Sequence, residues 1–124
     1  MMKKLLTVLA LGLSVIAGNA AWAHGEAAPR HGGIVAKAAD LSFELVLQAD
    51  GALLYVADHG KPVAAAGMSG KLTVLNGADK SEAELKPAGE RLEARGVKLG
   101  QGAKVVAAVT TVAKKTVTVR FTVK

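Results

Sequence analysis

The chain has 124 residues, a formal net charge of +6, no cysteine and 51% hydrophobic residues. The absence of cysteine excludes disulfides, thiolate metal sites and a cysteine nucleophile, so any metal must be held by nitrogen, oxygen or thioether ligands. The few aromatic residues leave no stacking platform for nucleic acid, and the basic residues are scattered along the chain rather than gathered in one run. We therefore expect no nucleic-acid partner.

Residues 1–23 have the pattern of a cleaved export signal. Two lysines precede an apolar run over residues 5–16, and residues 21–23 (Ala-Trp-Ala) form a small-x-small cleavage pattern. A weaker competing site at residues 18–20 would leave His24 internal. A retained anchor is disfavoured because the apolar run is shorter than the roughly 20 residues that a spanning helix needs. We expect cleavage before His24, no membrane span after it, and a mature chain of one small domain.

After a flexible His- and Gly-rich arm over residues 24–33, the remaining chain (34–124) is predicted to form one all-β domain. Short alternating segments are separated by turn pairs such as Asp50-Gly51 and Asn76-Gly77. Seven to nine short strands indicate an antiparallel β-sandwich with Greek-key, immunoglobulin-like connections, and a small closed barrel is the alternative. The expected strands cover residues 33–37, 41–48, 53–58, 71–75, 81–86, 92–99, 105–111 and 116–123, and residues 64–70 form either a loop or an edge strand.

The arm concentrates the metal-binding chemistry of the sequence. Cleavage would give His24 a free α-amino group beside its own imidazole, and His31 follows seven residues later. Imidazole nitrogens suit copper, zinc and nickel. An amine and two imidazoles therefore predict a divalent-metal site. The arrangement resembles the histidine brace of some exported copper proteins, with the N-terminal histidine as the matching feature. The alternative is a polar terminus without a ligand.

Two further residues complete the predicted metal ligands. His59 stands in a second Gly-containing turn, where its ring is available to a ligand, although a solvated turn residue beside Asp58 is an equal alternative. Met68 is the only methionine of the mature chain and could add a thioether, although a lone methionine more often fills a gap in apolar packing. The carboxylates form no evident catalytic pair and no serine stands in a Gly-x-Ser-x-Gly setting, so we expect no enzyme activity.

Four short motifs stand out in the first half of the predicted domain: residues 31–35 (HGGIV), 43–46 (FELV), 54–56 (LYV) and 58–63 (DHGKPV). They resemble a small periplasmic β-domain of Gram-negative bacteria, which occurs alone or joined to the periplasmic adaptor subunits of heavy-metal efflux systems of the resistance-nodulation-division type. The resemblance implies a periplasmic β-sandwich linked to copper or other heavy-metal handling, with a metal role for His31 most directly and for His59 less so. The chain lacks the hairpin and lipoyl-like segments of a full adaptor.

The leading hypothesis is a periplasmic heavy-metal-binding protein that buffers metal or delivers it to an efflux partner. Copper(II) is the expected metal, with zinc and nickel as alternatives, and the predicted ligands are His24, His31, His59 and Met68. The second hypothesis is a metal-independent β-sandwich module that docks on an envelope or efflux partner, with the last strand as an edge for strand addition. A brace-type copper oxidase acting on polysaccharide is disfavoured, because the mature chain offers few aromatic rings to stack against sugars.

Overall fold

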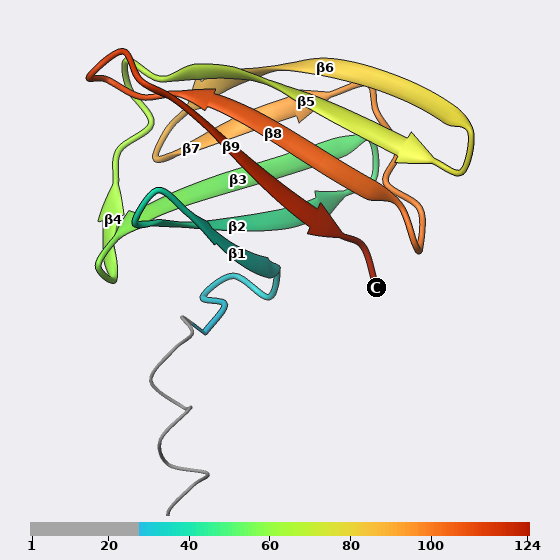
Figure 1. Ribbon diagram of the computed structural model, residues 1–124, viewed down its shortest axis with the longest axis horizontal. Coiled ribbons are helices and arrows are strands. Elements are labelled where there is room, and N and C mark those ends of the chain that lie inside the picture. Colours follow the sequence, from blue (N-terminus) through green and yellow to red (C-terminus); the bar gives the residue numbers. More distant parts are fainter. Residues whose placement is uncertain (1–27) are drawn as a thin grey trace, which may run out of the picture.

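The computed structural model describes residues 28–124, and this part of the chain consists of nine antiparallel strands without a helix (Figure 1). The predicted signal and His24 lie outside the described residues. Within residues 28–124 no helix is long and apolar enough to cross a membrane. The strands are β1 (Ile34–Ala38), β2 (Leu41–Gln48), β3 (Gly51–Asp58), β4 (Lys61–Val63), β5 (Ser69–Asn76), β6 (Asp79–Ala88), β7 (Arg91–Arg95), β8 (Lys104–Thr110) and β9 (Thr116–Thr122).

The prediction of an all-β chain with seven to nine short antiparallel strands is confirmed. Each expected strand is present; β2 has the predicted ends and the other strands have shifted ends. The short strand β4 was not predicted, and the ambiguous region 64–70 contains a loop followed by the start of β5. The expected strand over residues 92–99 is shorter, because β7 ends at Arg95 and Gly96 follows with φ of 82°. A positive φ is a glycine conformation that leaves the extended strand, so the chain turns there.

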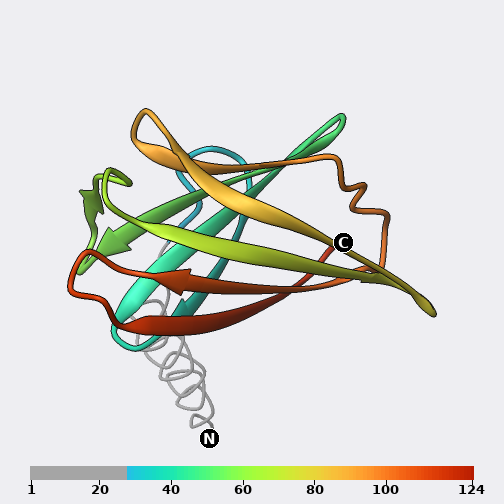
Figure 2. The ribbon, with the colours of Figure 1, turned by 90° about the horizontal axis from the view of Figure 1, so that it is seen from above.

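The strands form one nearly closed, barrel-like sheet in the order β1-β2-β3-β7-β6-β5-β8-β9, with β4 paired to β3. The sheet curls until β9 lies beside β1, although no backbone ladder joins these two strands (Figures 1 and 2). The arrangement does not show the two-layer sandwich that the strand count suggested. The predicted free edge of the last strand therefore faces β1.

The long strand β6 connects the two halves of the sheet. Its first part pairs with β5, and residues 86–88 pair with β7. The core lies inside the curl, where every strand except β1 and β4 contributes buried apolar residues. A strand that alternates points every second side chain inward. The last strand shows this alternation throughout, with Val117, Val119 and Phe121 buried between exposed neighbours. The largest fully buried side chains are Phe43, Leu45, Leu54, Leu72, Leu85, Leu92, Val74, Val97, Val105 and Val109.

Two tight hairpin turns stand at the end of the sheet that carries the site described below. Ala39 and Asp40 join β1 to β2 with φ of 50° and 68°, and His59 and Gly60 join β3 to β4 with φ of 50° and 84°. Positive φ at both central residues is typical of the type I′ turn, whose twist matches that of the flanking strands. The predicted turn at residues 59–62 is thus confirmed at its first two positions.

Candidate functional site

A short segment before β1 crosses the outer face of the sheet and covers one carboxylate. Glu44 lies between the core residues Phe43 and Leu45, so strand alternation points its side chain outward. Its partners in the neighbouring strands are Val35 of β1 and Tyr55 of β3. Glu44 is nevertheless only 7% exposed and is the one buried charged residue in the described chain.

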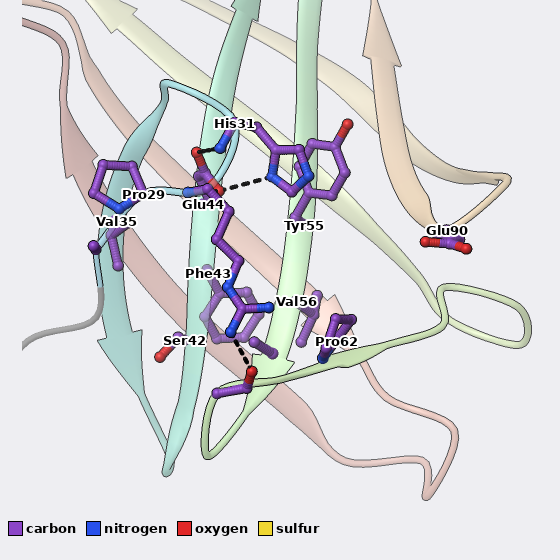
Figure 3. A pocket seen from close by; sticks show the side chains of 14 residues that line it. Pro29, His31, Val35, Ser42, Phe43, Glu44, Tyr55, Val56, Pro62 and Glu90 are labelled. Atoms are coloured by element: carbon purple, nitrogen blue, oxygen red, sulfur yellow. Dashed lines mark hydrogen bonds and ion pairs between the residues drawn. The ribbon is translucent and has the colours of Figure 1, made fainter.

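The backbone and side chain of residues 30–33 satisfy this buried carboxylate. The backbone N–H groups of His31 and Gly33 each donate to Glu44 Oε2 at 2.8 Å. The backbone N–H of Arg30 donates to Oε1 at 3.1 Å, and His31 Nδ1 lies 2.9 Å from the same oxygen (Figure 3). Three backbone donors and one ring nitrogen thus converge on a single side chain, which offsets the cost of burying its charge.

The ionisation of Glu44 follows from these contacts. Burial by itself raises the pKa of the carboxyl group, but the hydrogen bonds from the His31 side chain and from the backbone N–H groups of Gly33, His31 and Arg30 outweigh it. The net result is a Glu44 pKa below its ordinary value of 4.5. Glu44 is therefore a carboxylate at neutral pH and can only accept hydrogen bonds.

The protonation pattern of the His31 ring follows from the carboxylate. Because an ionised carboxylate has no proton to give, Nδ1 must carry the hydrogen of the 2.9 Å contact, and Nε2 of the neutral ring keeps its lone pair. The ring stacks on Tyr55, with centroids 3.6 Å apart and planes 7° from parallel (Figure 3). The His31 side chain remains 41% exposed. The site therefore presents an oriented imidazole with one nitrogen available to a ligand.

Two further features hold the segment against the sheet. Gly33 passes so close to β2 that a Cβ there would overlap the Leu45 carbonyl oxygen and lie 2.9 Å from Cγ2 of Val46. A side chain at position 33 would therefore push the segment outward. On the other side, the Arg30 guanidinium donates a hydrogen bond to the carbonyl oxygen of Gly60 in the β3–β4 turn.

A cavity of about 430 Å³ lies beside the stacked rings. Pro29 and Val35 border one side, Pro62 lies on the β3–β4 hairpin, and Glu90 projects from the β6–β7 turn (Figure 3). Ala28, the first described residue, also lines the cavity.

The structure does not bring His59 or Met68 to His31, and the third predicted partner, His24, lies outside the described residues. His59 Nδ1 lies 2.6 Å from Asp58 Oδ1 in the exposed turn, and His59 does not line the cavity although Gly60 does. Met68 is only 4% exposed and belongs to the hydrophobic core, where its thioether fills apolar packing. Among residues 28–124, no group of three or more histidine or carboxylate side chains is placed to hold a metal ion.

Sequence reasoning missed Glu44 and Tyr55 as site residues. An outward glutamate in an alternating strand has the pattern of an ordinary solvated residue, and its burial depends on residues 11 to 14 positions earlier. The available signal was the glycine pair at 32–33, which allows the segment to lie close against a strand.

No protein-family model, curated protein or solved structure matches this chain.

Proposed function

We propose that this chain is an exported, periplasmic protein that binds a heavy-metal ion, with copper(II) as the expected cargo and His31 as the central ligand. The observation that carries the proposal is the contact between His31 Nδ1 and the buried Glu44 carboxylate at 2.9 Å. Histidines that bind metals generally donate their second ring N–H to a carboxylate or carbonyl, which fixes the ring and raises the basicity of the ligating nitrogen. Glu44 is suited to that role, and Nε2 would be the ligating atom.

The described residues supply only one such imidazole, so the remaining ligands must come from elsewhere. Ala28 lies four positions after His24 in the sequence, and an extended chain spans at most about 3.6 Å per residue. The amine and imidazole of His24 could therefore reach positions within about 14 Å of Ala28, which lines the cavity beside His31. This reach supports the amine, the His24 ring and His31 as the ligand set, and the proposal does not depend on His59 or Met68.

The resemblance of about residues 31–75 to small periplasmic domains of heavy-metal efflux systems supports the same function. It suggests that the protein buffers metal or delivers it to the periplasmic adaptor of such a system. Histidine nitrogens also suit zinc and nickel, which remain the alternative cargo. We propose no catalytic activity, since the carboxylate beside His31 is fully engaged by hydrogen bonds.

The strand order supports the Greek-key part of the predicted fold. Strands β5, β6 and β7 are linked by hairpins, and β8 returns to lie beside β5, which gives the order 8-5-6-7 of a Greek key. The passage of β6 from β5 to β7 divides the strands into two halves, which supports the proposal of a sandwich-like, immunoglobulin-type relationship.

The test is copper(II) binding by the mature protein, secreted from a Gram-negative host with its own signal. Intact mass must first give a chain that begins at His24. We expect one tightly held copper ion, and at least about tenfold weaker binding for His31→Ala, because a principal ligand is removed. His59→Ala is the matched control, and less than about threefold change is expected there. Unchanged copper binding by His31→Ala would overturn the proposal.

A second variant separates the ligand role of His31 from the role of Glu44. Glu44→Gln keeps the shape of the side chain but removes its charge, so His31 loses the ionic partner of Nδ1. Loss of such an outer partner typically weakens metal binding by about 10- to 100-fold. Copper binding that is lost in His31→Ala but unchanged in Glu44→Gln would remove the orienting role from Glu44.

A metal-independent interaction module is the second candidate function. Among residues 28–124 no group of three side chains is placed to hold a metal ion, which favours this function. The tight anchoring of residues 30–33 would then shape a docking surface and would not orient a metal ligand. Affinity capture from a metal-free periplasmic extract discriminates the two functions. Recovery of the same partner by the protein and by a His31→Ala/His59→Ala double variant would favour the module.

A further inference from the structure

The charges of this chain are divided unequally along its length. Residues 28–95 carry eight Lys and Arg residues and nine Asp and Glu residues, so their formal net charge is −1. Residues 96–124 carry six Lys and Arg residues and no acidic residue, so their formal net charge is +6. The cations therefore gather in the region of β8 and β9, and the expectation that they are scattered does not hold there.

The register of the last hairpin places three of these cations on one face. Residues 119–124, which run from β9 into the chain after it, alternate, with Val119, Phe121 and Val123 buried and the residues between them exposed. Arg120 and Lys124 therefore point outward. Lys104 of β8 stands opposite Thr122, between these two positions, and is also exposed. Diagonal neighbours across a ladder lie about 7–8 Å apart, so Lys104 and Arg120 are neighbours on the outer face. Lys124 lies just beyond the ladder, two residues after the partner of Lys104, and adds a third exposed cation to this cluster.

Lys114 and Lys115 extend this positive surface to the turn between the two strands, where both are exposed. Within residues 28–124, the ion pairs of lysine and arginine side chains involve Lys71, Lys80, Lys86 and Arg95. None of the six cations after residue 95 has a carboxylate partner in this part of the chain. Their field is therefore uncompensated locally and acts on whatever approaches the face.

We propose that this basic face, defined by Lys104, Arg120 and Lys124 and extended by Lys114 and Lys115, docks on an anionic phospholipid surface. The positive charge and the extended shape of the face favour this partner. Lysine and arginine spread along a two-stranded face suit a surface of uniform negative charge, to which each cation adds attraction without specific packing. This docking is distinct from metal binding, because the face lies on β8 and β9, whereas His31 precedes β1 and stacks on Tyr55 of β3.

The composition of the face disfavours an acidic protein and a single-stranded nucleic acid as its partner. The cores of protein interfaces are enriched in aromatic residues and methionine, whereas the outward residues of β9 are threonines and Arg120. Single-stranded nucleic acid is held by stacking on aromatic rings. The described aromatic residues are Phe43 and Phe121 in the core and Tyr55 beneath His31, so the face offers no ring for stacking.

The test is co-sedimentation of the secreted mature protein with vesicles of phosphatidylcholine alone or of phosphatidylcholine mixed with phosphatidylglycerol. We expect binding to the anionic vesicles only. Binding should disappear as salt is raised from about 0.01 M to about 1 M, because the Debye length falls from about 30 Å to about 3 Å. Binding that is equal on neutral vesicles, or that survives high salt, would overturn the proposal.

Charge-matched variants locate the surface. Lys104→Gln/Arg120→Gln/Lys124→Gln removes three positive charges from the face, and Lys61→Gln/Lys80→Gln/Lys86→Gln removes three exposed charges elsewhere. One cation near an anionic surface is worth about fivefold in binding, so the face variant should lose at least about tenfold and the control less than about threefold. All six positions are exposed, and thermal melting verifies folding. Equal losses in the two variants would mean that vesicle binding depends only on the net charge of the protein. This result would overturn the proposed docking face.

Binding of the same protein is also measured to polyglutamate and to single-stranded DNA, which take the place of the vesicles. Binding to either polymer under conditions where anionic vesicles recover no protein would assign the face to that partner and reject the lipid proposal.

Discussion

Two histidine–carboxylate pairs of similar local geometry stand on the same half of this molecule, and they differ in what surrounds them. His31 Nδ1 lies 2.9 Å from Glu44, and His59 Nδ1 lies 2.6 Å from Asp58. The Glu44 side chain is 8% exposed, whereas the Asp58 side chain is 54% exposed and its histidine 82%. The shorter contact is therefore the one that water surrounds.

The difference lies in what each carboxylate organises. Asp58 bonds to the next residue in its own turn, so the pair constrains no other part of the chain. Glu44 binds three backbone N–H groups from 11 to 14 residues away and fixes a segment across two strands. Exposed ion pairs typically contribute about 0–1 kcal/mol, while buried hydrogen bonds to a charged group contribute about 1.5–3 kcal/mol each. The distance between ring nitrogen and carboxylate oxygen therefore does not show which pair contributes more to stability.

Alanine substitution of the two carboxylates should separate the pairs most clearly. Glu44→Ala removes the acceptor of three backbone N–H groups, and we expect the free energy of unfolding to fall by about 2–3 kcal/mol. Asp58→Ala should change it by no more than about 0.5 kcal/mol. Chemical denaturation monitored by circular dichroism measures both values. Equal effects would mean that burial does not distinguish the two pairs.

A substitution at Gly33 should disturb the buried pair without changing either of its members. In Gly33→Ala the new methyl group would overlap the Leu45 carbonyl oxygen, so the segment must move away from β2. We expect a loss of about 1–2 kcal/mol and faster proteolysis at residues 28–33.

Gly32→Ala is the matched control for the crowding at position 33. A Cβ at position 32 meets no atom within 4 Å, but the φ of 73° is strained for alanine. Its cost should stay near about 1 kcal/mol and leave proteolysis of the segment unchanged. Faster cleavage in Gly32→Ala than in Gly33→Ala would show that the close approach at position 33 does not fix the segment.

The local pattern of the sequence was sufficient to predict the strands but not the way they close. Residues 41–48 and 116–123 alternate clearly, and both became strands with the predicted residues Phe43, Leu45 and Phe121 in the core. Leu47, which alternates with Phe43 and Leu45, is 41% exposed near the end of β2. The approach of β9 to β1 joins the two ends of the sheet, and no local pattern encodes such a contact.

The candidate site was predictable only in part for the same reason. His31 was identified from its residue type and its glycine neighbours, both of which are local features. The burial of Glu44 and the stacking of Tyr55 depend on a segment that folds over two strands, which strand alternation cannot reveal. Met68 shows the opposite case, because its loop position suggested a ligand while the structure places the side chain in the core.

Acid should weaken the buried pair through the protonation of Glu44, with a smaller effect than its removal. The pKa of Glu44 in the folded protein lies below its ordinary value of 4.5, so ionisation stabilises the folded state in full above about pH 4.5. This contribution declines as the pH falls below that value and is lost once the pH passes through the lowered folded pKa. Protonated Glu44 keeps its shape and one acceptor oxygen, so part of the contact with residues 30–33 persists.

Glu44→Gln provides the reference for this acid effect, since glutamine has nothing to titrate in that range. The difference in unfolding free energy between the protein and Glu44→Gln should be constant between about pH 5 and pH 7 and should shrink as the pH falls toward 3. Denaturation curves recorded at each pH give this difference directly. A difference that grows as the pH falls would have the wrong sign for a lowered pKa. It would mean that burial, rather than the hydrogen bonds from residues 30–33, dominates the ionisation of Glu44.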